Sequence, residues 1–270
     1  MIPSTLEYTK ASSIDEAIAA VAAGARPLAG GQSLLPMMRL RLAAPGAVVD
    51  LGGVAELVGV CEDGDEIAVG AMTTHRAVAA DPLIAEHCRV VAEAASGVGS
   101  LVIRGRGTIG GSLAHADPHG DLPAAILAAG GAVIARGPGG ERRIEIGDLI
   151  TSYLTTSLAA DELITQVRLP KGNAQSAYAK FHRRAIDWSI VGVGVSIGAD
   201  GVRAAATGVA DRPTRLAGFE AAINGGASVD EAARAAGEGI DPTADLDGSS
   251  EYKRHLAGVL AGQAYLAAQG

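Results

Sequence analysis

The sequence predicts an α+β fold arranged in two domains. A chain of 270 residues is long enough for two domains of the usual size, ~100–200 residues each. A short, polar stretch rich in structure breakers, Pro170-Lys171-Gly172-Asn173, is the best linker candidate. Beyond it, three expected strands precede three expected helices, an order typical of an α+β unit. We therefore expect domains at residues 1–172 and 173–270.

The chain is expected to begin as strand, helix and strand. Ser13-Ile14-Asp15-Glu16 has the form of a capping box, apolar residues then recur at helical spacing, and Gly24 ends the helix. An apolar strand at residues 26–29 leads directly into a glycine pair. The next expected elements are a helical turn at 34–40, a strand at 47–51, a hairpin at 57–69 around Glu62-Asp63-Gly64-Asp65, and a mostly helical stretch at 73–95 that breaks at Asp81-Pro82.

The second half of the chain alternates apolar segments with clear turn signals. Residues 122–129 are expected to be helical, and residues 132–136 to pair with 143–146 across Gly137-Pro138-Gly139-Gly140. A strand at 163–169 then closes the first domain. Further strands are expected at 178–181, 189–197 and 202–208, and helices at about 215–223, 229–236 and 249–268.

Composition excludes several classes of protein. The formal net charge is -8, and no cluster of Lys and Arg could follow a phosphate backbone, so we expect no nucleic-acid partner. Only two cysteines are present, which argues against a disulfide scaffold and suits a reducing cytoplasm. We find no secretory signal, and the most apolar stretch, residues 122–135, is too short and glycine-broken to span a membrane. We therefore expect a cytoplasmic protein.

Two segments place paired glycines between an apolar residue and a small hydroxyl residue. They are Ala29-Gly30-Gly31-Gln32-Ser33 and Thr108-Ile109-Gly110-Gly111-Ser112. Glycine allows positive φ and close backbone approach, so two such loops could clasp the two phosphates of a dinucleotide. Neither segment matches the Rossmann fingerprint or the P-loop. Each taken alone is also compatible with a simple tight turn, since the chain has 37 glycines.

The second segment belongs to a longer run that resembles a known motif. Residues 107–118, Gly-Thr-Ile-Gly-Gly-Ser-Leu-Ala-His-Ala-Asp-Pro, continue to Asp121-Leu122-Pro123-Ala124. This run resembles the second FAD motif of the medium-sized flavoprotein subunits of molybdenum hydroxylases, the family of xanthine dehydrogenase and carbon monoxide dehydrogenase. Residues 29–33 resemble the first motif, and the likeness covers residues 1–200 in order and spacing, and the remainder more weakly.

The resemblance implies a fold and a set of cofactor contacts. It implies a two-lobed PCMH-type domain, similar to that of vanillyl-alcohol oxidase, with lobes at about 1–53 and 54–172, followed by a smaller α+β domain at 173–270. The residues implied to bind the FAD pyrophosphate are Ala29, Gly30, Gly31, Gln32, Ser33, Thr108, Ile109, Gly110, Gly111 and Ser112. Many relatives have His at the position of Gln32 and Asn at that of Ser112. Replacing Gly31 or Gly110 by Val is expected to abolish FAD retention with less effect on folding.

Four further residues match cofactor contacts of the family: Asp121, Ile164, Lys180 and Trp188. Each polar or aromatic one has a plainer alternative. Asp121 could instead cap the helix that follows it, and Lys180 could be a solvated strand residue. Trp188, the only tryptophan, falls where relatives have an aromatic beside the flavin ring, but it could equally pack in the core or anchor a subunit interface.

Other charged residues near the second motif are weaker candidates. Arg104 and Arg106 could assist the phosphates or simply be solvated charges. His115, Asp117 and His119 alternate in a way that suggests metal binding, but they lack a further ligand, so we expect no metal site. No nucleophile and base have a recognisable catalytic context, so we assign no catalytic residue to this chain.

The resemblance implies an oxidoreductase that works as an electron relay. FAD in this chain would take electrons from two [2Fe–2S] clusters of a small partner and pass them to an external acceptor. A large partner would hold molybdopterin and select the substrate. Two cysteines cannot supply the four thiolates of a cluster, so we expect partner chains, in a dimer of heterotrimers. Two alternatives stay open: a self-contained FAD-dependent oxidoreductase with its own small substrate, and a cofactor-free scaffold module.

Overall fold

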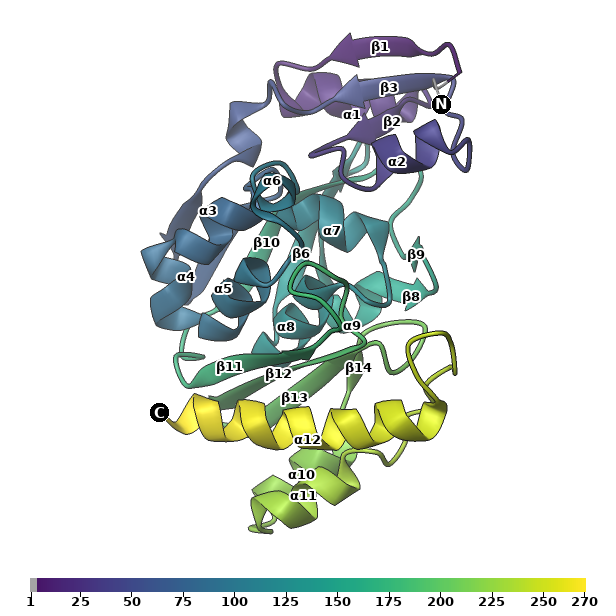
Figure 1. The fold of residues 1–270 in the computed structure, drawn as a ribbon. Helices are drawn as coiled ribbons and strands as arrows, with labels where there is room; N and C mark the ends of the chain where they lie inside the picture. Colours follow the sequence, from purple (N-terminus) through teal and green to yellow (C-terminus); the bar gives the residue numbers. More distant parts are fainter. Residues whose placement is uncertain (1–3) are drawn as a thin grey trace.

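A small parallel sheet opens the chain. The structure, a computed structural model, describes residues 4–270, so the first three residues of the predicted first domain lie outside the described part. The elements are β1 (Glu7–Lys10), α1 (Ile14–Ala22), β2 (Arg26–Leu28), α2 (Leu34–Arg39) and β3 (Ala47–Asp50). The strands pair in the order β1-β3-β2, all parallel, with α1 packed against them at the top of Figure 1.

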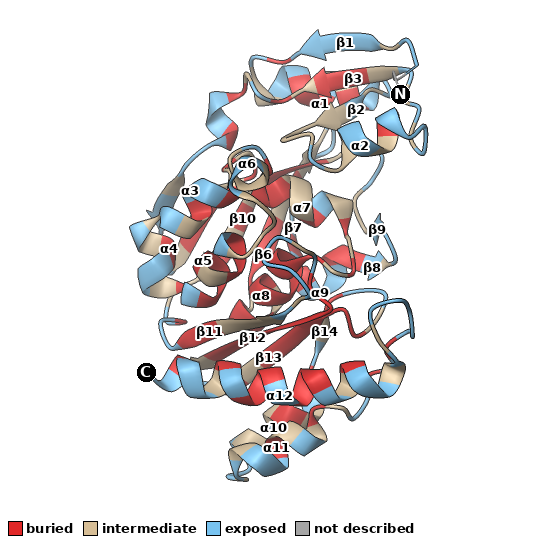
Figure 2. Ribbon diagram, in the orientation of Figure 1, coloured by how far each residue is buried: buried red, intermediate tan, exposed pale blue. Residues whose placement is uncertain are grey.

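The central body is a five-stranded antiparallel sheet covered by helices. Its strands are β4 (Val60–Asp63), β5 (Glu66–Gly70), β6 (Ala132–Gly137), β7 (Gly140–Glu145) and β10 (Leu163–Pro170). The order β4-β5-β10-β6-β7 places β10 between two hairpins. The helices are α3 (His75–Ala80), α4 (Pro82–His87), α5 (Arg89–Ser96), α6 (Leu101–Arg104), α7 (Ile109–His115) and α8 (Asp121–Ala129). One large apolar core fills the space between the sheet and these helices, except α6, which contributes no residue to it (Figure 2).

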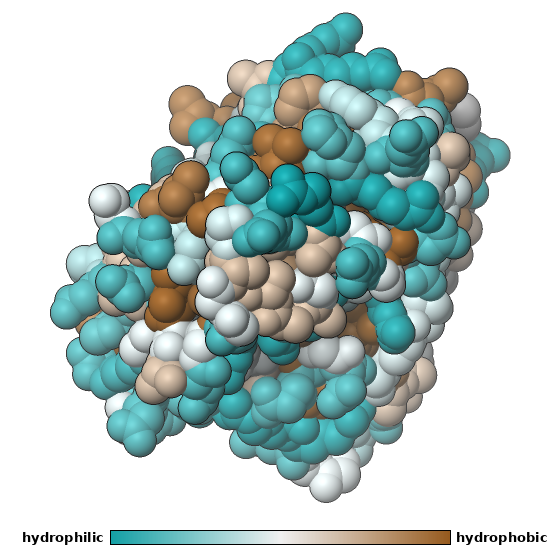
Figure 3. Space-filling view, turned by 90° about the horizontal axis from the view of Figure 1, so that it is seen from below, coloured by the Kyte–Doolittle hydropathy of each residue, from teal (hydrophilic) through white to brown (hydrophobic). Residues whose placement is uncertain are grey.

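A second antiparallel sheet connects this body to the C-terminal helices. It consists of β11 (Ser176–Phe181), β12 (Val191–Gly198), β13 (Gly201–Thr207) and β14 (Thr214–Arg215), in that order. Helix α8 lies against one face of it, and α12 (Ser250–Gln269) and α10 (Ala217–Asn224) cover the other, with α11 (Val229–Ala235) outside them (Figure 1). Seen from below, the outer face of these C-terminal helices is largely hydrophilic, with separated apolar patches (Figure 3).

The predicted α+β class is confirmed, as are most of the long elements. The helical stretch at 73–95 breaks at Asp81-Pro82 as expected, and again at Cys88. Helix α1 starts at the predicted cap, since the Ser13 hydroxyl accepts the Glu16 N–H, but the Glu16 carboxylate binds Ser12 instead of completing the capping box. The elements that were not predicted are all short: η1 (Ala55–Leu57), α9 (Ile146–Leu149), β8 (Ile150–Ser152), β9 (Thr155–Thr156), α6, α7 and β14.

No helix within residues 4–270 is both long enough and apolar enough to cross a membrane.

A buried histidine lies where α3 meets the segment before α7. His75 is 5% exposed, and its ring lies directly beneath Gly107, where an added Cβ would come within 2.8 Å of it. Its Nδ1 has no hydrogen-bond partner in the described chain. Burial, and to a smaller extent the charge of Arg104, lower the pKa of His75 to about 4. The imidazole is therefore neutral at physiological pH.

Acid should destabilise the fold through His75. In the unfolded chain the pKa returns to about 6.5, so the unfolded state binds more protons between that pH and about 4. The contribution of His75 to the free energy of unfolding is therefore fully present above pH 6.5. It is lost as the pH falls to about 4, which lowers the free energy of unfolding by up to about 3 kcal/mol. Urea unfolding across this range should show a weaker pH dependence for His75→Leu than for the wild type. Equal pH dependence would contradict the prediction.

Candidate functional site

The two glycine segments predicted from the sequence lie side by side. A Cβ added to Gly30 would come within 2.0 Å of the Arg106 carbonyl oxygen, and one added to Gly111 would lie 3.4 Å from the Cβ of Ala29. The first segment therefore packs directly on the chain that enters α7. Glycine at position 30 is needed because only hydrogen fits at this backbone contact.

The first segment presents a row of backbone donors without partners. Within the described chain, the N–H groups of residues 30–34 donate to no protein acceptor, and neither does the Ser33 hydroxyl. Gly31 has φ +73°, a left-handed conformation that turns successive N–H groups toward one side. The Gln32 side chain folds back onto the Gly30 carbonyl oxygen at 3.2 Å. The segment is half-exposed, so an anionic group can reach these donors.

The second segment is not a loop, contrary to the sequence prediction. Thr108 caps α7, accepting the Gly111 N–H on its hydroxyl at 3.2 Å. The other three N–H groups also donate within the chain: Ile109 to Thr73, Gly110 to Ala71 and Ser112 to Thr108. The segment therefore offers a ligand no N–H from residues 109–112. The half-buried Ser112 hydroxyl, which has no partner in the described chain, stays available.

The expected mild effect of Gly110→Val on folding is wrong. A Cβ at Gly110 would come within 2.6 Å of the Ala71 Cβ and 2.9 Å of its carbonyl oxygen. This glycine is buried where α7 meets the end of β5, and the obstacle includes rigid backbone. Its replacement would therefore disturb the packing of the protein itself.

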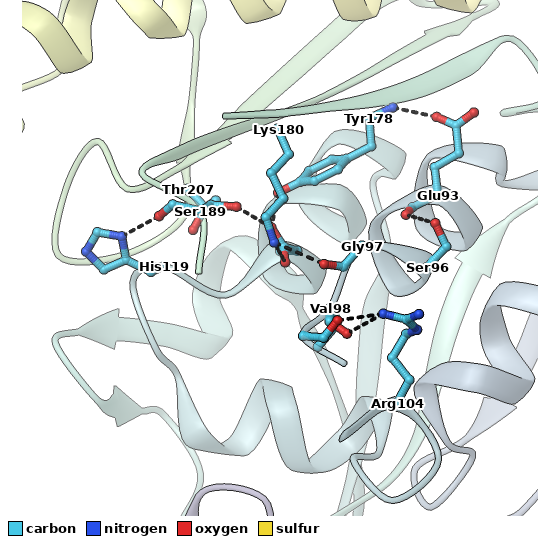
Figure 4. A network of polar contacts seen from close by, with 12 residues as sticks. Glu93, Ser96, Gly97, Val98, Arg104, His119, Tyr178, Lys180, Ser189 and Thr207 are labelled. Atoms are coloured by element: carbon cyan, nitrogen blue, oxygen red, sulfur yellow. Dashed lines mark hydrogen bonds and ion pairs between the residues drawn. The ribbon is translucent and has the colours of Figure 1, made fainter. Parts of the chain in front are cut away.

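Asp121 is the centre of a buried polar network, and its partners Tyr178, Lys180 and Ser189 are labelled in Figure 4. One carboxylate oxygen, Oδ1, accepts hydrogen bonds from the Tyr178 hydroxyl at 2.8 Å and from the Ser189 hydroxyl. The other, Oδ2, pairs with Lys180 Nζ at 2.9 Å. The side chains of Asp121 and Lys180 are only 4% and 9% exposed. Both plainer alternatives are therefore wrong: Gly120, not Asp121, caps α8, and Lys180 is not solvated.

The Tyr178 hydroxyl is the donor in its hydrogen bond with Asp121. Burial raises the pKa of Tyr178 well above its ordinary value, and the negative charge of Asp121 raises it further. The phenol thus stays protonated at physiological pH. Breaking a buried ion pair by removing one partner costs about 3–5 kcal/mol, so the three donors around Asp121 matter for keeping its charge inside the protein.

Two cations hold the turn between α5 and α6. Lys180 Nζ donates to the Gly97 carbonyl oxygen at 3.1 Å, and Arg104 Nη1 donates to those of Val98 and Gly99 at 2.9 and 2.7 Å (Figure 4). Three consecutive carbonyl groups thus face positive charge. Arg104 is not a simple solvated charge, whereas Arg106 is exposed.

Ile164 and Trp188 occupy opposite environments. Ile164 is 6% exposed in β10, and its side chain belongs to the apolar core, so only its backbone could meet a ligand. Trp188 is 59% exposed, so the core-packing alternative is wrong. The indole lines a cleft of about 520 Å³ together with Asp117, His119, Asp245 and Lys253.

The alternating residues His115, Asp117 and His119 do not converge. His115 Nε2 lies 3.8 Å from Asp117, while His119 Nδ1 is turned to the Ser189 carbonyl oxygen at 2.8 Å. Among residues 4–270 no three His, Cys, Asp or Glu side chains are grouped to hold a metal ion.

Tyr178 and Ser189 were missed in the sequence. Tyr178 stands two residues before Lys180 on the same strand, so both side chains lie on one face of β11. That spacing was a usable signal. Ser189 carried none, because it precedes β12 at the end of an irregular loop.

Comparison with known proteins identifies two families of domains. The family described as "FAD binding domain in molybdopterin dehydrogenase" matches residues 4–172. The family described as "CO dehydrogenase flavoprotein C-terminal domain" matches residues 176–268.

Individual relatives match along nearly the whole chain. The nicotine 6-hydroxylase medium subunit of Paenarthrobacter nicotinovorans is 37% identical over 93% of each chain. The carbon monoxide dehydrogenase medium chain of Hydrogenophaga pseudoflava is 34% identical, over 99% of this chain and 98% of that one. A solved structure of carbon monoxide dehydrogenase from the same organism, lacking the Mo-pyranopterin moiety, superposes with a TM-score of 0.94 at 35% identity, covering 100% of this chain and 99% of that one.

A substitution at Gly31 should weaken binding of the expected cofactor, FAD. Alanine at φ +73° costs about 1 kcal/mol, which favours rotation of the peptide and loss of the aligned donors. We expect the dissociation constant for FAD to rise about fivefold in Gly31→Ala, measured by flavin fluorescence titration. The matched control is Gly24→Ala, where φ is +95° and an added Cβ meets no atom within 4 Å. Equal affinities in the two variants would refute a role for the first segment.

Proposed function

Because the chain belongs to the family of FAD-binding subunits of molybdopterin dehydrogenases, we propose that it is the electron-transfer subunit of a molybdenum hydroxylase. In this role it takes electrons from [2Fe–2S] clusters of a partner chain and passes them to an external acceptor. The observation that carries the proposal is the row of unpaired N–H groups at residues 30–34, packed against the start of α7. Aligned N–H groups suit the two negative phosphates of FAD.

The remaining residues fit the cofactor in different ways. The pyrophosphate would be held by the backbone N–H groups of residues 29–33 and the Ser33 hydroxyl, and on its other side by residues 108–112, chiefly through the Ser112 hydroxyl. Ile164 would contribute only backbone. Lys180, with Asp121 as its counter-ion, would donate to the flavin, and the exposed indole of Trp188 would cover the ring. FAD itself supplies the ability to take up and release electrons singly or in pairs.

The cysteines of the chain support a relay with partner subunits. Cys61 is exposed, whereas Cys88 is buried, donates to the Pro170 carbonyl oxygen, and has its pKa raised by burial to about 12. With only two cysteines, the chain cannot supply the four thiolates of a cluster, so a cluster needs another chain. We therefore assign the iron–sulfur clusters to a small partner and molybdopterin to a large one, in a cytoplasmic dimer of heterotrimers.

We also propose that the chain consists of two domains, residues 1–172 and 173–270. The first domain has two lobes, at about 1–53 and 54–172. The two family matches, 4–172 and 176–268, support this division. Asp121 and Lys180 then stand on opposite sides of the boundary, so the flavin site needs both domains.

Purification of the tagged chain from its own cells tests the proposal. We expect two partner chains to copurify, one larger and one smaller than this chain. The complex should show the visible absorption bands of flavin and of iron–sulfur clusters, and elemental analysis should detect molybdenum. Dithionite should bleach both sets of bands. Flavin without partner chains would instead indicate a self-contained oxidoreductase, and a complex without flavin would refute the proposal.

Tryptophan fluorescence tests the placement of Trp188. Because this is the only tryptophan of the chain and its side chain is exposed, the subunit freed of FAD should emit at the long wavelength of a solvated indole. Adding FAD should quench most of this emission if the ring stacks on the indole. FAD binding that leaves the emission unchanged would place the flavin elsewhere. Partner chains are separated beforehand, so their tryptophans do not contribute.

A further inference from the structure

We infer that Tyr178 and Ser189 are positioning residues for the flavin, acting through Asp121 and Lys180. Both hydroxyls donate to the same carboxylate oxygen, Asp121 Oδ1, and thereby leave Oδ2 to Lys180 alone. The inference rests on the proposed function, because it assumes that Lys180 faces bound FAD.

Tyr178 is built into its place by the surrounding strands. Its backbone N–H donates to the Glu93 carboxylate at 2.8 Å, which fixes the free edge of β11. Its side chain crosses Gly192 on β12, where an added Cβ would come within 2.1 Å of the phenol oxygen. The strand next to Tyr178 thus has no side chain at the point where the hydroxyl passes on its way to Asp121.

Ser189 is likewise fixed in place, by burial and by backbone hydrogen bonds. The residue is 1% exposed, and its carbonyl oxygen lies 2.8 Å from His119 Nδ1, which therefore donates to it. The next residue, Ile190, donates its N–H to the Phe181 carbonyl oxygen at 2.9 Å. From this fixed backbone the Ser189 hydroxyl, labelled in Figure 4, donates to Asp121 Oδ1.

The network leaves Lys180 with a single donor for a ligand. An ammonium group has three N–H donors, and in the described chain two of them serve Asp121 Oδ2 and the Gly97 carbonyl oxygen. The direction of the third N–H follows from the positions of those two acceptors. Since Asp121 Oδ2 is oriented by the hydrogen bonds on Oδ1, Tyr178 and Ser189 determine where the third donor points.

The same hydrogen bonds control the electric field at the flavin. Each hydroxyl that donates to Asp121 offsets part of its negative charge, so removing a donor makes the local potential more negative. Reduction of FAD then becomes less favourable. We expect Tyr178→Phe and Ser189→Ala each to lower the midpoint potential of bound FAD, and the double variant to lower it further. Asp121→Asn, which removes the negative charge, should raise it.

Spectroelectrochemical titration of the purified complex measures these shifts, alongside flavin content and thermal unfolding. The matched control is Thr207→Val, which removes another buried hydroxyl that donates to a backbone oxygen, Pro118 O at 2.6 Å, without touching Asp121. It should leave the potential unchanged. Ser189→Thr, which restores a hydroxyl, should return the potential toward the wild-type value.

The outcomes separate this inference from the proposed function. If Asp121→Asn shifts the potential while Tyr178→Phe and Ser189→Ala behave as the Thr207→Val control, the positioning role is refuted and the flavin assignment stands. If either variant loses its fold instead, the role of that hydroxyl is structural and the inference is equally refuted. A wild-type complex without FAD would refute both.

Discussion

The buried ion pair between Asp121 and Lys180 is the interaction on which the site depends. Moving two charges out of water is costly, and attraction between them offsets that cost only when their remaining hydrogen-bonding capacity is also satisfied. Here the carboxylate has three donors and the ammonium has the carboxylate and one carbonyl oxygen. The pair is therefore stable only with α8, β11 and the end of α5 in one arrangement, which makes the geometry of the site a consequence of the fold.

Backbone contacts connect the ion pair between Asp121 and Lys180 to the first glycine segment. Lys180 and Arg104 together orient the carbonyl groups of the turn before α6, and the chain then continues through α6 to the backbone that packs on Gly30. The segment with free N–H groups and the ion pair are thus linked by one continuous stretch, residues 97–107. A change at Lys180 should for this reason be felt at the glycine segment, although the two are far apart in sequence.

Much of the fold could be predicted because its long elements carry their own periodic pattern. Residues 163–169 and 189–197 have the apolar content of buried strands, and Ser13 and Asp81 are helix caps with local signals. Two- and three-residue strands such as β8 and β9 have no period to detect. Ser189 and Asp121 are 68 residues apart, and their contact arises only when β12 packs on α8. No local pattern records such a contact.

The two glycine segments show why a motif alone could not assign their roles. Both have adjacent glycines followed by a small hydroxyl residue, yet the first keeps its N–H groups free while the second donates all four from residues 109–112 to its own chain. The difference comes from Ala71 and Thr73, just after β5, whose carbonyl groups accept the N–H groups of Gly110 and Ile109, and from Thr108, which accepts the other two. Glycine at position 110 serves close packing, and glycine at position 31 serves a half-exposed left-handed turn. The same residue type thus serves close packing in one segment and a turn with free backbone N–H groups in the other.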